Sequence, residues 1–484
     1  MSMLLTLAEV VEAGTKAGSP DLQQIFSTAT YIIAGICFIL SLKWLSSPTS
    51  ARRGNIVGEI GMAAAIIGAL LQHNIISYEW IITGLVLGTL IGAPLAIWMP
   101  MTAVPQRTAF SHACGALAAA LVGTAHFYIA ANVGPALDHT TMAILCVEVL
   151  LGALTFTGSL MAFGKLQEIL PQRPITFKGQ NYFNFLILGL ALATGVVLSI
   201  NPSMTMLFPL LLVLAMLFGV LLIIPIGGAD MPTVIALLNS YAGMSACLMG
   251  FVLHNQLLII AGALDGASGF VLSIIMCKAM NRSFTNVLFG AFGQLQTTAG
   301  GPGEKRTVRS GTPEEAAQIM EAAQSVIIIP GYGMAVAQAQ HKVREMFDQL
   351  TKRGVDVKFA IHPVAGRMPG HMNVLLAEAE IPYDKLIEMD EINGEFPQCD
   401  VALVIGANDV VNPAARHDKN SPIYGMPILD ADKARTVMAI KRSMKPGFAG
   451  IENELYFADN CMMLFGDAKA VVASVAKELA DAAK

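Results

Sequence analysis

Residues 325–336 read Ser-Val-Ile-Ile-Ile-Pro-Gly-Tyr-Gly-Met-Ala-Val, and this stretch indicates how the C-terminal part of the chain folds. A short apolar run ends at two glycines, Gly331 and Gly333, and a helical pattern follows. This order is typical of a dinucleotide-binding turn, because Gly331 permits a tight turn and Gly333 lets backbone approach a pyrophosphate at the helix N-terminus. The usual third glycine is replaced by Val336, so the prediction depends on the strand and helix around the motif.

Apolar and helical segments alternate from this motif to the end of the chain. Strands are expected at 325–330, 355–361, 385–389, 400–406, 435–441 and 461–465, and helices near 334–352, 370–380 and 467–481. Such alternation predicts a soluble α/β Rossmann-like domain with a parallel, doubly wound sheet. A Gly-rich connector precedes it, and Thr312 with Glu315 forms a capping box that opens the first helix.

The remainder of the chain is too apolar for a soluble protein. Of 484 residues, 54% are hydrophobic and 13% charged, against about 25% charged in a soluble domain. Residues 1–282 hold ten Lys/Arg and ten Asp/Glu. Residues 283–484 hold twenty Lys/Arg and twenty-five Asp/Glu, so the net negative charge lies in the C-terminal part. This balance excludes a basic nucleic-acid-binding protein. Seven scattered cysteines without a C-x-x-C pair argue against disulfide, iron–sulfur and zinc frameworks, so no metal is expected.

Nine apolar runs come near the roughly 20 residues that a helix needs to cross a bilayer. They lie near 26–45, 56–73, 80–99, 108–131, 140–163, 182–200, 204–225, 231–253 and 256–279. Lys and Arg follow the first, third, fifth and ninth runs, whereas the loops after the second, fourth, sixth and eighth contain none. This bias predicts a polytopic α-helical membrane domain with the C-terminal domain in the cytoplasm and the N-terminus outside.

Several polar residues lie inside or beside these runs. An ionisable side chain at such depth usually faces a cavity or a partner. His112 is therefore either a histidine bonded to a neighbouring helix or a proton relay, since an unperturbed pKa of about 6.5 suits proton exchange near neutrality. Glu148 and Asp265 could equally be buried neutral acids, while Asn239 and Asp230 belong to the eighth run and its entrance.

The ends of two strands predict which nucleotide binds. Phe359–Arg367 carries no carboxylate of the kind that usually holds the ribose 2′-hydroxyl of NAD. Lys441-Arg442-Ser443 ends a later strand and suits a phosphate, although it could be a solvated basic edge. Together these features favour NADP. His362, Arg367 and His371 form either a cationic surface or part of the cofactor site, and Asp409 either contacts the ligand or caps the next turn.

From about residue 27 to its end, the chain resembles the β subunit of proton-translocating NAD(P) transhydrogenases. The motifs that carry the resemblance are 330–340, 361–378, 388–393, 406–409, 412–415, 441–444 and 466–469, with 227–232 and 238–243 in the membrane part. The resemblance implies an enzyme that transfers hydride between NADH and NADP⁺ and couples this to proton movement. NADP(H) would bind to this chain and NAD(H) to a partner α subunit.

The resemblance also assigns residues. His112 and Asn239 match proton-channel positions and Asp230 a coupling position, and Asp409 is the catalytic candidate near the nicotinamide. The implied cofactor-binding residues are Gly331, Tyr332, Gly333, Val364, Ala365, Gly366, Arg367, Met368, Pro369, Gly406, Ala407, Asn408, Asp409, Gly425, Met426, Lys441, Arg442, Ser443, Phe448, Asp467, Ala468 and Lys469. Phe448 stands where a tyrosine is expected, so a hydroxyl contact is lost there.

The expected organisation is an N-terminal extension (1–25), a transmembrane proton-translocating domain (26–282), a flexible linker (283–311) and an NADP(H)-binding domain (312–484). The resemblance implies a multi-pass protein of the bacterial inner membrane, in a dimer of the whole complex. Two other classes remain. A transporter could merely sense NADP(H), which redox turnover with the partner would disprove. A structural anchor for a soluble dehydrogenase would not need polar residues in its spans.

Overall fold

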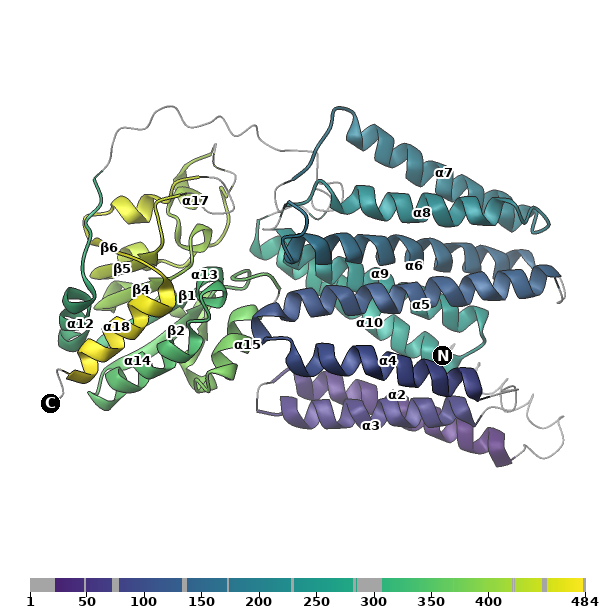
Figure 1. The fold of residues 1–484 in the computed structure, drawn as a ribbon, viewed down its shortest axis with the longest axis horizontal. Helices are drawn as coiled ribbons and strands as arrows, with labels where there is room; N and C mark the ends of the chain where they lie inside the picture. The colour runs from purple at the N-terminus through teal and green to yellow at the C-terminus, as the bar shows by residue number, and fades with distance from the viewer. Residues whose placement is uncertain are drawn as a thin grey trace. The chain divides into compact units, whose positions relative to one another are not determined.

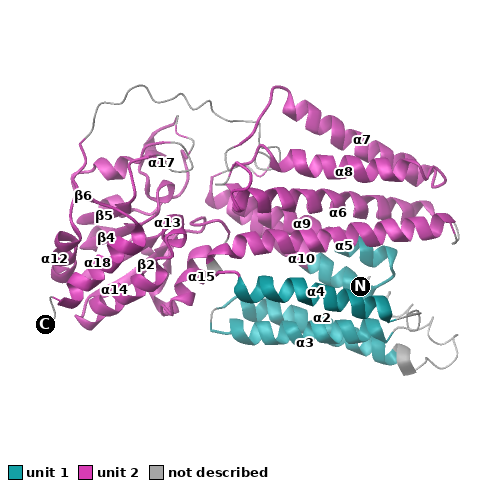
Figure 2. Ribbon diagram, in the orientation of Figure 1, with its two compact units in different colours: residues 1–98, 246–264 teal, residues 99–245, 265–484 magenta. Residues whose placement is uncertain are grey.

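The computed structural model describes residues 22–47, 49–71, 78–132, 137–171, 174–227, 230–281, 284, 307–368, 370–419, 421, 423–445 and 451–481. These residues belong to two compact units, 1–98 with 246–264, and 99–245 with 265–484 (Figure 2). Residues 1–21 of the expected extension, most of the expected linker, Pro369 and Phe448 lie outside the described residues.

Among the described residues, nine apolar helices correspond one by one to the nine predicted spans (Figure 1). They are α2 (Leu22–Leu45), α3 (Ala51–Leu70), α4 (Glu79–Trp98), α5 (Val104–Asn132), α6 (His139–Leu166), α7 (Gln180–Ile200), α8 (Leu207–Ile223), α9 (Met231–Val252) and α10 (Gln256–Ala279). Within the described part of the chain, eight of them are long and apolar enough to cross a membrane. The ninth, α8, has 17 residues, the lower end of the spanning range.

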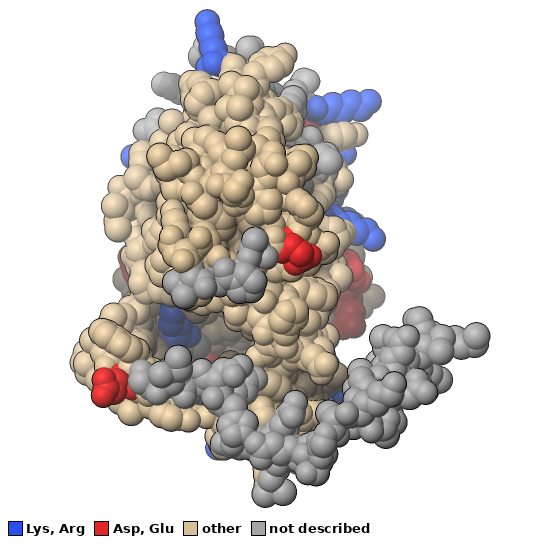
Figure 3. All heavy atoms as spheres, turned by 90° about the vertical axis from the view of Figure 1, so that its right-hand side faces the viewer, with Lys and Arg blue, Asp and Glu red and all other residues tan. Residues whose placement is uncertain are grey.

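Helix α4 shows how these helices suit a lipid environment. None of its residues is buried, and Trp80 and Trp98 near its two ends are 80% and 79% exposed. Eighteen residues of helix separate them by about 27 Å, close to the thickness of the hydrocarbon core. Tryptophan is enriched at both membrane interfaces. On the face shown in Figure 3, charged side chains are few and uncharged residues dominate.

Glycine allows close helix contacts, as the small residues of the spans suggested. A Cβ on Gly243 of α9 would lie 2.3 Å from the backbone nitrogen of Gly266 on α10. A Cβ on Gly219 of α8 would lie 2.2 Å from the carbonyl oxygen of Leu154 on α6. Without a hydrophobic force between helices in lipid, such backbone approach provides the packing.

The C-terminal part forms a six-stranded, all-parallel sheet in the order β3-β2-β1-β4-β5-β6. Its strands are β1 (Ser325–Pro330), β2 (Asp356–Ile361), β3 (Leu386–Glu388), β4 (Val401–Ile405), β5 (Thr436–Lys441) and β6 (Cys461–Phe465). Every predicted strand is present, each within one residue at either end. This is the doubly wound order, in which successive strands are added outward from β1 to one side and then, from β4 on, to the other side.

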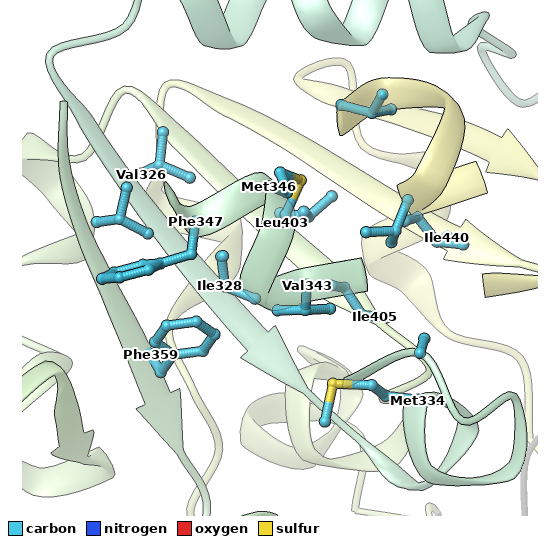
Figure 4. Close-up of a cluster of buried hydrophobic side chains, with 14 of the residues drawn as sticks. Val326, Ile328, Met334, Val343, Met346, Phe347, Phe359, Leu403, Ile405 and Ile440 are labelled. Carbon is cyan, nitrogen blue, oxygen red and sulfur yellow. The ribbon is translucent and has the colours of Figure 1, made fainter. Parts of the chain in front are cut away.

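Helices cover one face of the sheet and shorter segments the other. Ile328 points into a core shared with α12 (Pro313–Ala322), α14 (Gln340–Lys352), α15 (His371–Glu378) and α18 (Ala468–Asp481), as Figure 4 shows in part. Ile327 and Ile329 face the opposite core. That second face carries α16 (Met389–Ile392), η4 (Phe396–Gln398), η5 (Asp409–Val411), η6 (Ala431–Lys433) and η7 (Glu454–Phe457). The remaining short helices are η1 (Met101–Ala103), α17 (Ala414–His417) and η3 (Tyr383–Lys385).

Two local predictions have different outcomes. The capping box is confirmed, because the Thr312 hydroxyl accepts from the Glu315 amide at 3.3 Å and the Glu315 carboxylate accepts from the Thr312 amide at 3.2 Å. The single helix predicted at 334–352 is wrong. It consists of α13 (Tyr332–Val336) and α14, separated at Gln338, whose φ of 49° is incompatible with a continuous right-handed helix.

Candidate functional site

The turn after β1 lies directly against the loop after β4, at the carboxyl edge of the sheet. The amide of Gly331 donates to the Ile405 carbonyl and that of Gly333 to the Gly406 carbonyl, both at 2.9 Å. A Cβ on Gly331 would lie 2.4 Å from the Cα of Ala407. Both glycines are therefore required by this neighbouring loop, whatever ligand approaches them. Gly406 itself has a φ of 67°, which glycine adopts without strain.

Asn408 organises the loop after β4. Its side-chain oxygen accepts from Lys441 Nζ at 3.2 Å and lies 3.0 Å from the Tyr456 hydroxyl. Its side-chain amide donates to Asp409 at 2.8 Å, and its backbone carbonyl accepts from Asn453 at 2.8 Å. The loop that sequence motifs placed near the nicotinamide is thus tied to β5 and to the segment before η7.

Lys441 contributes a positive charge to the network around Asn408. Its ammonium lies 4.8 Å from the centre of the Tyr456 ring. Burial lowers the pKa of Lys441, and the charge of Asp409 opposes that shift. Arg442 and Ser443 follow at the end of β5 and are exposed. The structure therefore combines one sheltered cation with an exposed cation and hydroxyl, a set suited to a phosphate.

His362 and His371, after β2, are not a cationic surface, so that alternative is wrong. His362 Nδ1 accepts from the Val364 amide at 3.2 Å, leaving Nε2 to donate to the Pro427 carbonyl at 2.8 Å. Burial lowers the pKa of His362 to about 4. Burial, aided by the charge of Arg367, lowers the pKa of His371 to about 4 as well. Both rings are neutral near pH 7 and hold the loop together.

Arg367 is the cation of this loop, and its side chain is only 5% exposed. Its guanidinium stacks over the Tyr332 ring at 4.2 Å. Nη1 donates to the carbonyl of Leu166, the last residue of α6, at 2.7 Å, and Nη2 lies 3.3 Å from a Glu168 carboxylate oxygen. The predicted residues Val364, Ala365, Gly366 and Met368 belong to the same loop. Arg367 thus contacts both the glycine turn and the end of a membrane helix.

The other predicted residues occupy two further loops. Gly425 has a φ of 75°, and its amide donates to the Ala415 carbonyl at 2.8 Å; Met426 follows it. Asp467 caps α18, since its carboxylate accepts from the Lys469 amide at 3.1 Å. Ala468 is buried as the first residue of that helix. Lys469 lines a cavity of about 300 Å³ with Gln338, Lys342 and Glu378 among its neighbours.

In the membrane helices, the structure adds Asp265 to the predicted residues. The Asn239 amide of α9 donates to the Asp265 carboxylate of α10 at 3.1 Å. Close packing of α9 on α10 permits this contact, and Ser240 donates to the Gly266 carbonyl beside it at 2.8 Å. Asp230 stands one residue before α9, about 14 Å along the helix axis from Asn239.

Comparison with known proteins identifies the family. The family model described as "NAD(P) transhydrogenase beta subunit" matches residues 27–478. The chain belongs to the NAD(P) transhydrogenase β subunit family. Two proteins of Rhodospirillum rubrum named NAD(P) transhydrogenase subunit beta are each 52% identical over 458 residues, covering 93% of this chain and 98% of the relative. The resemblance drawn from the motifs is confirmed.

For a transhydrogenase β subunit, the structure also points to residues that the motifs did not select. Tyr456 and Asn453 hold the loop after β4 although they follow β5 by more than ten residues. Glu168 reaches Arg367 from a distant part of the chain. No sequence spacing relates these residues to the motifs. For Asp265, by contrast, an ionisable group within an apolar run was a usable signal.

Proposed function

We propose that this chain binds NADP(H) and moves protons in a membrane transhydrogenase, with hydride passing between NADH and NADP⁺. Membership of the β subunit family is the observation that carries this proposal. The apolar helices and the Rossmann-like sheet that follows them supply the two parts that such coupling needs.

The residues at the carboxyl edge of the sheet fit NADP(H). Ligands of doubly wound sheets bind where the strand order reverses, here between β1 and β4, and the glycine turn lies there. Lys441, Arg442 and Ser443 would hold the 2′-phosphate. Arg367 and Tyr332 would flank the nucleotide.

Bound nicotinamide supplies the hydride chemistry, and the protein contributes orientation and exclusion of water. Asn408 keeps Asp409 and Lys441 in one network, so the loop after β4 would orient the nicotinamide end. Asp409 is proposed as the residue at the reacting centre. Gly425 and Met426, with Asp467–Lys469, would close the site.

His112 and Asn239 are proposed to carry the proton through the membrane, with Asp230 linking them to the nucleotide domain. The contact of Asn239 with Asp265 supports a polar route between α9 and α10. Replacing His112 with alanine is expected to abolish proton pumping in membrane vesicles. Pumping that stays fully coupled to hydride transfer would refute this assignment.

The proposed domains are an extension (1–25), a proton-translocating membrane domain (26–282), a linker (283–311) and an NADP(H)-binding domain (312–484). The family implies an α subunit as partner, and we propose that this partner carries NAD(H). We further propose a dimer of the whole complex in the bacterial inner membrane, with the C-terminal domain in the cytoplasm, as the distribution of basic residues supports.

The first test measures binding of NADP⁺ and NAD⁺ to the full chain in detergent by calorimetry. The wild type should prefer NADP⁺, and a Lys441→Ala/Arg442→Ala variant should lose the preference. Lys352→Ala/Lys385→Ala removes two charges elsewhere on the soluble domain and should leave it unchanged. Equal binding of the two nucleotides by the wild type would contradict the 2′-phosphate assignment. Binding without hydride transfer in the complex with the partner would favour a transporter that senses NADP(H).

A further inference from the structure

Glu168 occupies a position at which the backbone disfavours a glutamate. It lies two residues beyond the end of α6 and has a φ of 61°. Just past a helix end this left-handed conformation is usually taken by glycine, because a Cβ makes it strained in other residues. A glutamate there suggests that the side chain has a task that offsets the backbone strain.

Glu168 contacts the loop that follows β2. Its carboxylate lies 3.3 Å from Nη2 of Arg367, 199 residues later in the chain. The other terminal nitrogen, Nη1, donates to the Leu166 carbonyl at 2.7 Å. That carbonyl is one of the last four of α6, which lack partners within the helix and carry partial negative charge. The end of α6 therefore presents two acceptors to the two terminal nitrogens of one guanidinium.

This pair of acceptors resembles the oxygens of a phosphate. Arginine binds carboxylates and phosphates through the same planar fork. The guanidinium of Arg367 also lies on the Tyr332 ring, within the glycine turn where the nucleotide is proposed to bind. The end of α6 thus occupies the edge of the guanidinium formed by its two terminal nitrogens. A phosphate that binds along this edge competes with the end of α6 for Arg367.

We propose that Glu168 is a positioning residue of the NADP(H) site, which acts by holding the Arg367 guanidinium at the end of α6 in competition with the nucleotide phosphates. The inference rests on the proposed function, since it takes Arg367 to be a nucleotide ligand. Movement of the α6 end then changes NADP(H) affinity. Because linkage is reciprocal, bound nucleotide releases the α6 end in turn. Proton movement among the helices thereby gains a route to the nucleotide site.

A second membrane helix makes a similar contact. Asn281 follows α10, has a φ of 48°, and donates through its side chain to the Tyr424 carbonyl at 3.0 Å. A Cβ on Gly425 would lie 2.2 Å from this amide nitrogen. The loop proposed to cover the nucleotide is thus held by α10 as the Arg367 loop is held by α6. Glu168 and Asn281 thus each follow a membrane helix in a left-handed conformation, and each contacts a loop of the proposed nucleotide site. This parallel supports a positioning role for the helix ends.

The test uses the full chain in complex with its partner subunit, with NADP⁺ affinity measured by titration and KM and kcat by hydride transfer. Glu168→Gln should bind NADP⁺ about two- to fivefold more tightly, the scale expected for an ion pair whose carboxylate side chain is 68% exposed. KM for NADP⁺ should fall. Hydride transfer in sealed vesicles should respond less to a protonophore, because coupling through α6 is weakened. Glu345→Gln, the same change at an exposed carboxylate paired with Lys342, should have no effect.

Two further variants separate this role from a structural one. Glu168→Gly relieves the left-handed backbone, so it should fold at least as well as the wild type and still bind NADP⁺ more tightly. Glu168→Asp keeps the carboxylate, so its NADP⁺ affinity should lie between those of the wild type and Glu168→Gln. In an Arg367→Lys background, Glu168→Gln should have no further effect, since the lysine lacks the two-nitrogen fork.

The outcomes are distinguishable. Unchanged or weaker NADP⁺ binding in Glu168→Gln and Glu168→Gly would overturn the inference. An equal effect of Glu168→Gln in the Arg367→Lys background would overturn the route through Arg367. If Arg367→Lys binds NADP⁺ less tightly while the Glu168 variants behave as wild type, the inference fails and the proposed function stands. If the wild type binds no NADP⁺, the proposed function itself fails.

Discussion

At the scale of single residues, buried polar side chains around the sheet edge serve to fix loops. His362 and His371 are neutral and bonded to backbone. Tyr456 is almost fully buried, and burial raises the pKa of its hydroxyl well above the ordinary value, so it remains a donor. These groups support the loops that carry the residues proposed to touch the nucleotide. Replacing them should alter nucleotide binding although they make no contact with the nucleotide themselves.

Tyr456→Phe is expected to weaken NADP⁺ binding about tenfold. The variant removes the hydroxyl that lies 3.0 Å from both the Ala407 carbonyl and the Asn408 side-chain oxygen. One net hydrogen bond contributes about 1–1.5 kcal/mol, which corresponds to roughly a factor of ten in affinity. Calorimetry on the full chain in detergent measures the effect. Tyr383→Phe, at a half-exposed tyrosine, serves as the control, and equal affinity of Tyr456→Phe and wild type would contradict the network.

The buried histidines predict a dependence of stability on pH. Because the pKa of His362 is about 4 in the folded chain and about 6.5 when unfolded, the unfolded state binds more protons between these values. The contribution of His362 to the free energy of unfolding is therefore fully present above about pH 6.5. It is lost on acidification toward pH 4, by about 3 kcal/mol at most.

This dependence can be tested with His362→Asn, which keeps a donor and an acceptor without the titration. Its melting temperature in detergent should fall less between pH 7 and about pH 5 than that of the wild type. His341→Asn changes an exposed histidine and should follow the wild type. Parallel pH profiles for His362→Asn and wild type would show that His362 does not titrate on unfolding.

At the scale of elements, the meeting of two strand ends decides the shape of the site. The turn after β1 and the loop after β4 are in contact through their backbones. A side chain at either glycine of the turn would push the two segments apart and break this contact. The strands themselves follow from short apolar runs between polar segments. The break between α13 and α14 does not, because Gln338 adopts a left-handed conformation that its residue type does not favour.

Gly331→Ala is expected to destabilise the nucleotide domain by about 1–3 kcal/mol, the usual cost of overpacking. The new methyl group would lie 2.4 Å from both the Cα and the nitrogen of Ala407. NADP⁺ binding should fall at least tenfold because the loop carrying Asn408 must shift. Melting and calorimetry measure the two effects. Gly394→Ala has its nearest atom at 3.9 Å and should be neutral. Similar behaviour of the two variants would refute the close approach.

At the scale of the whole molecule, the number of crossings fixes the sides of the two termini. An odd number places them on opposite sides of the membrane. Whether the number of crossings is odd depends on α8, whose 17 residues extend about 26 Å. Its two neighbours in sequence, α7 and α9, are long enough to cross unaided.

Epitope tags test this parity. Tags added before Met1 and after Lys484 should be accessible from opposite faces, the C-terminal tag only in inverted vesicles and the N-terminal tag only in right-side-out vesicles. Nine crossings and the distribution of Lys and Arg give this expectation. A tag inserted a few residues before α2 should behave like the N-terminal tag and serves as the control. Both terminal tags on one side would mean that α8 does not cross.

The apolar spans, the six strands and the family could all be predicted from the amino-acid sequence. Hydrophobic runs and glycine turns are local in the chain, and they reflect strong constraints of lipid and of parallel sheets. The sequence also selected His112, Asn239 and the motif residues as candidates. Only the tertiary structure joined Asn239 to Asp265, Tyr456 to Asn408 and Arg367 to Glu168. These contacts join residues 26, 48 and 199 positions apart, and a contact at such separation depends on how helices and strands pack in three dimensions, which no local pattern specifies.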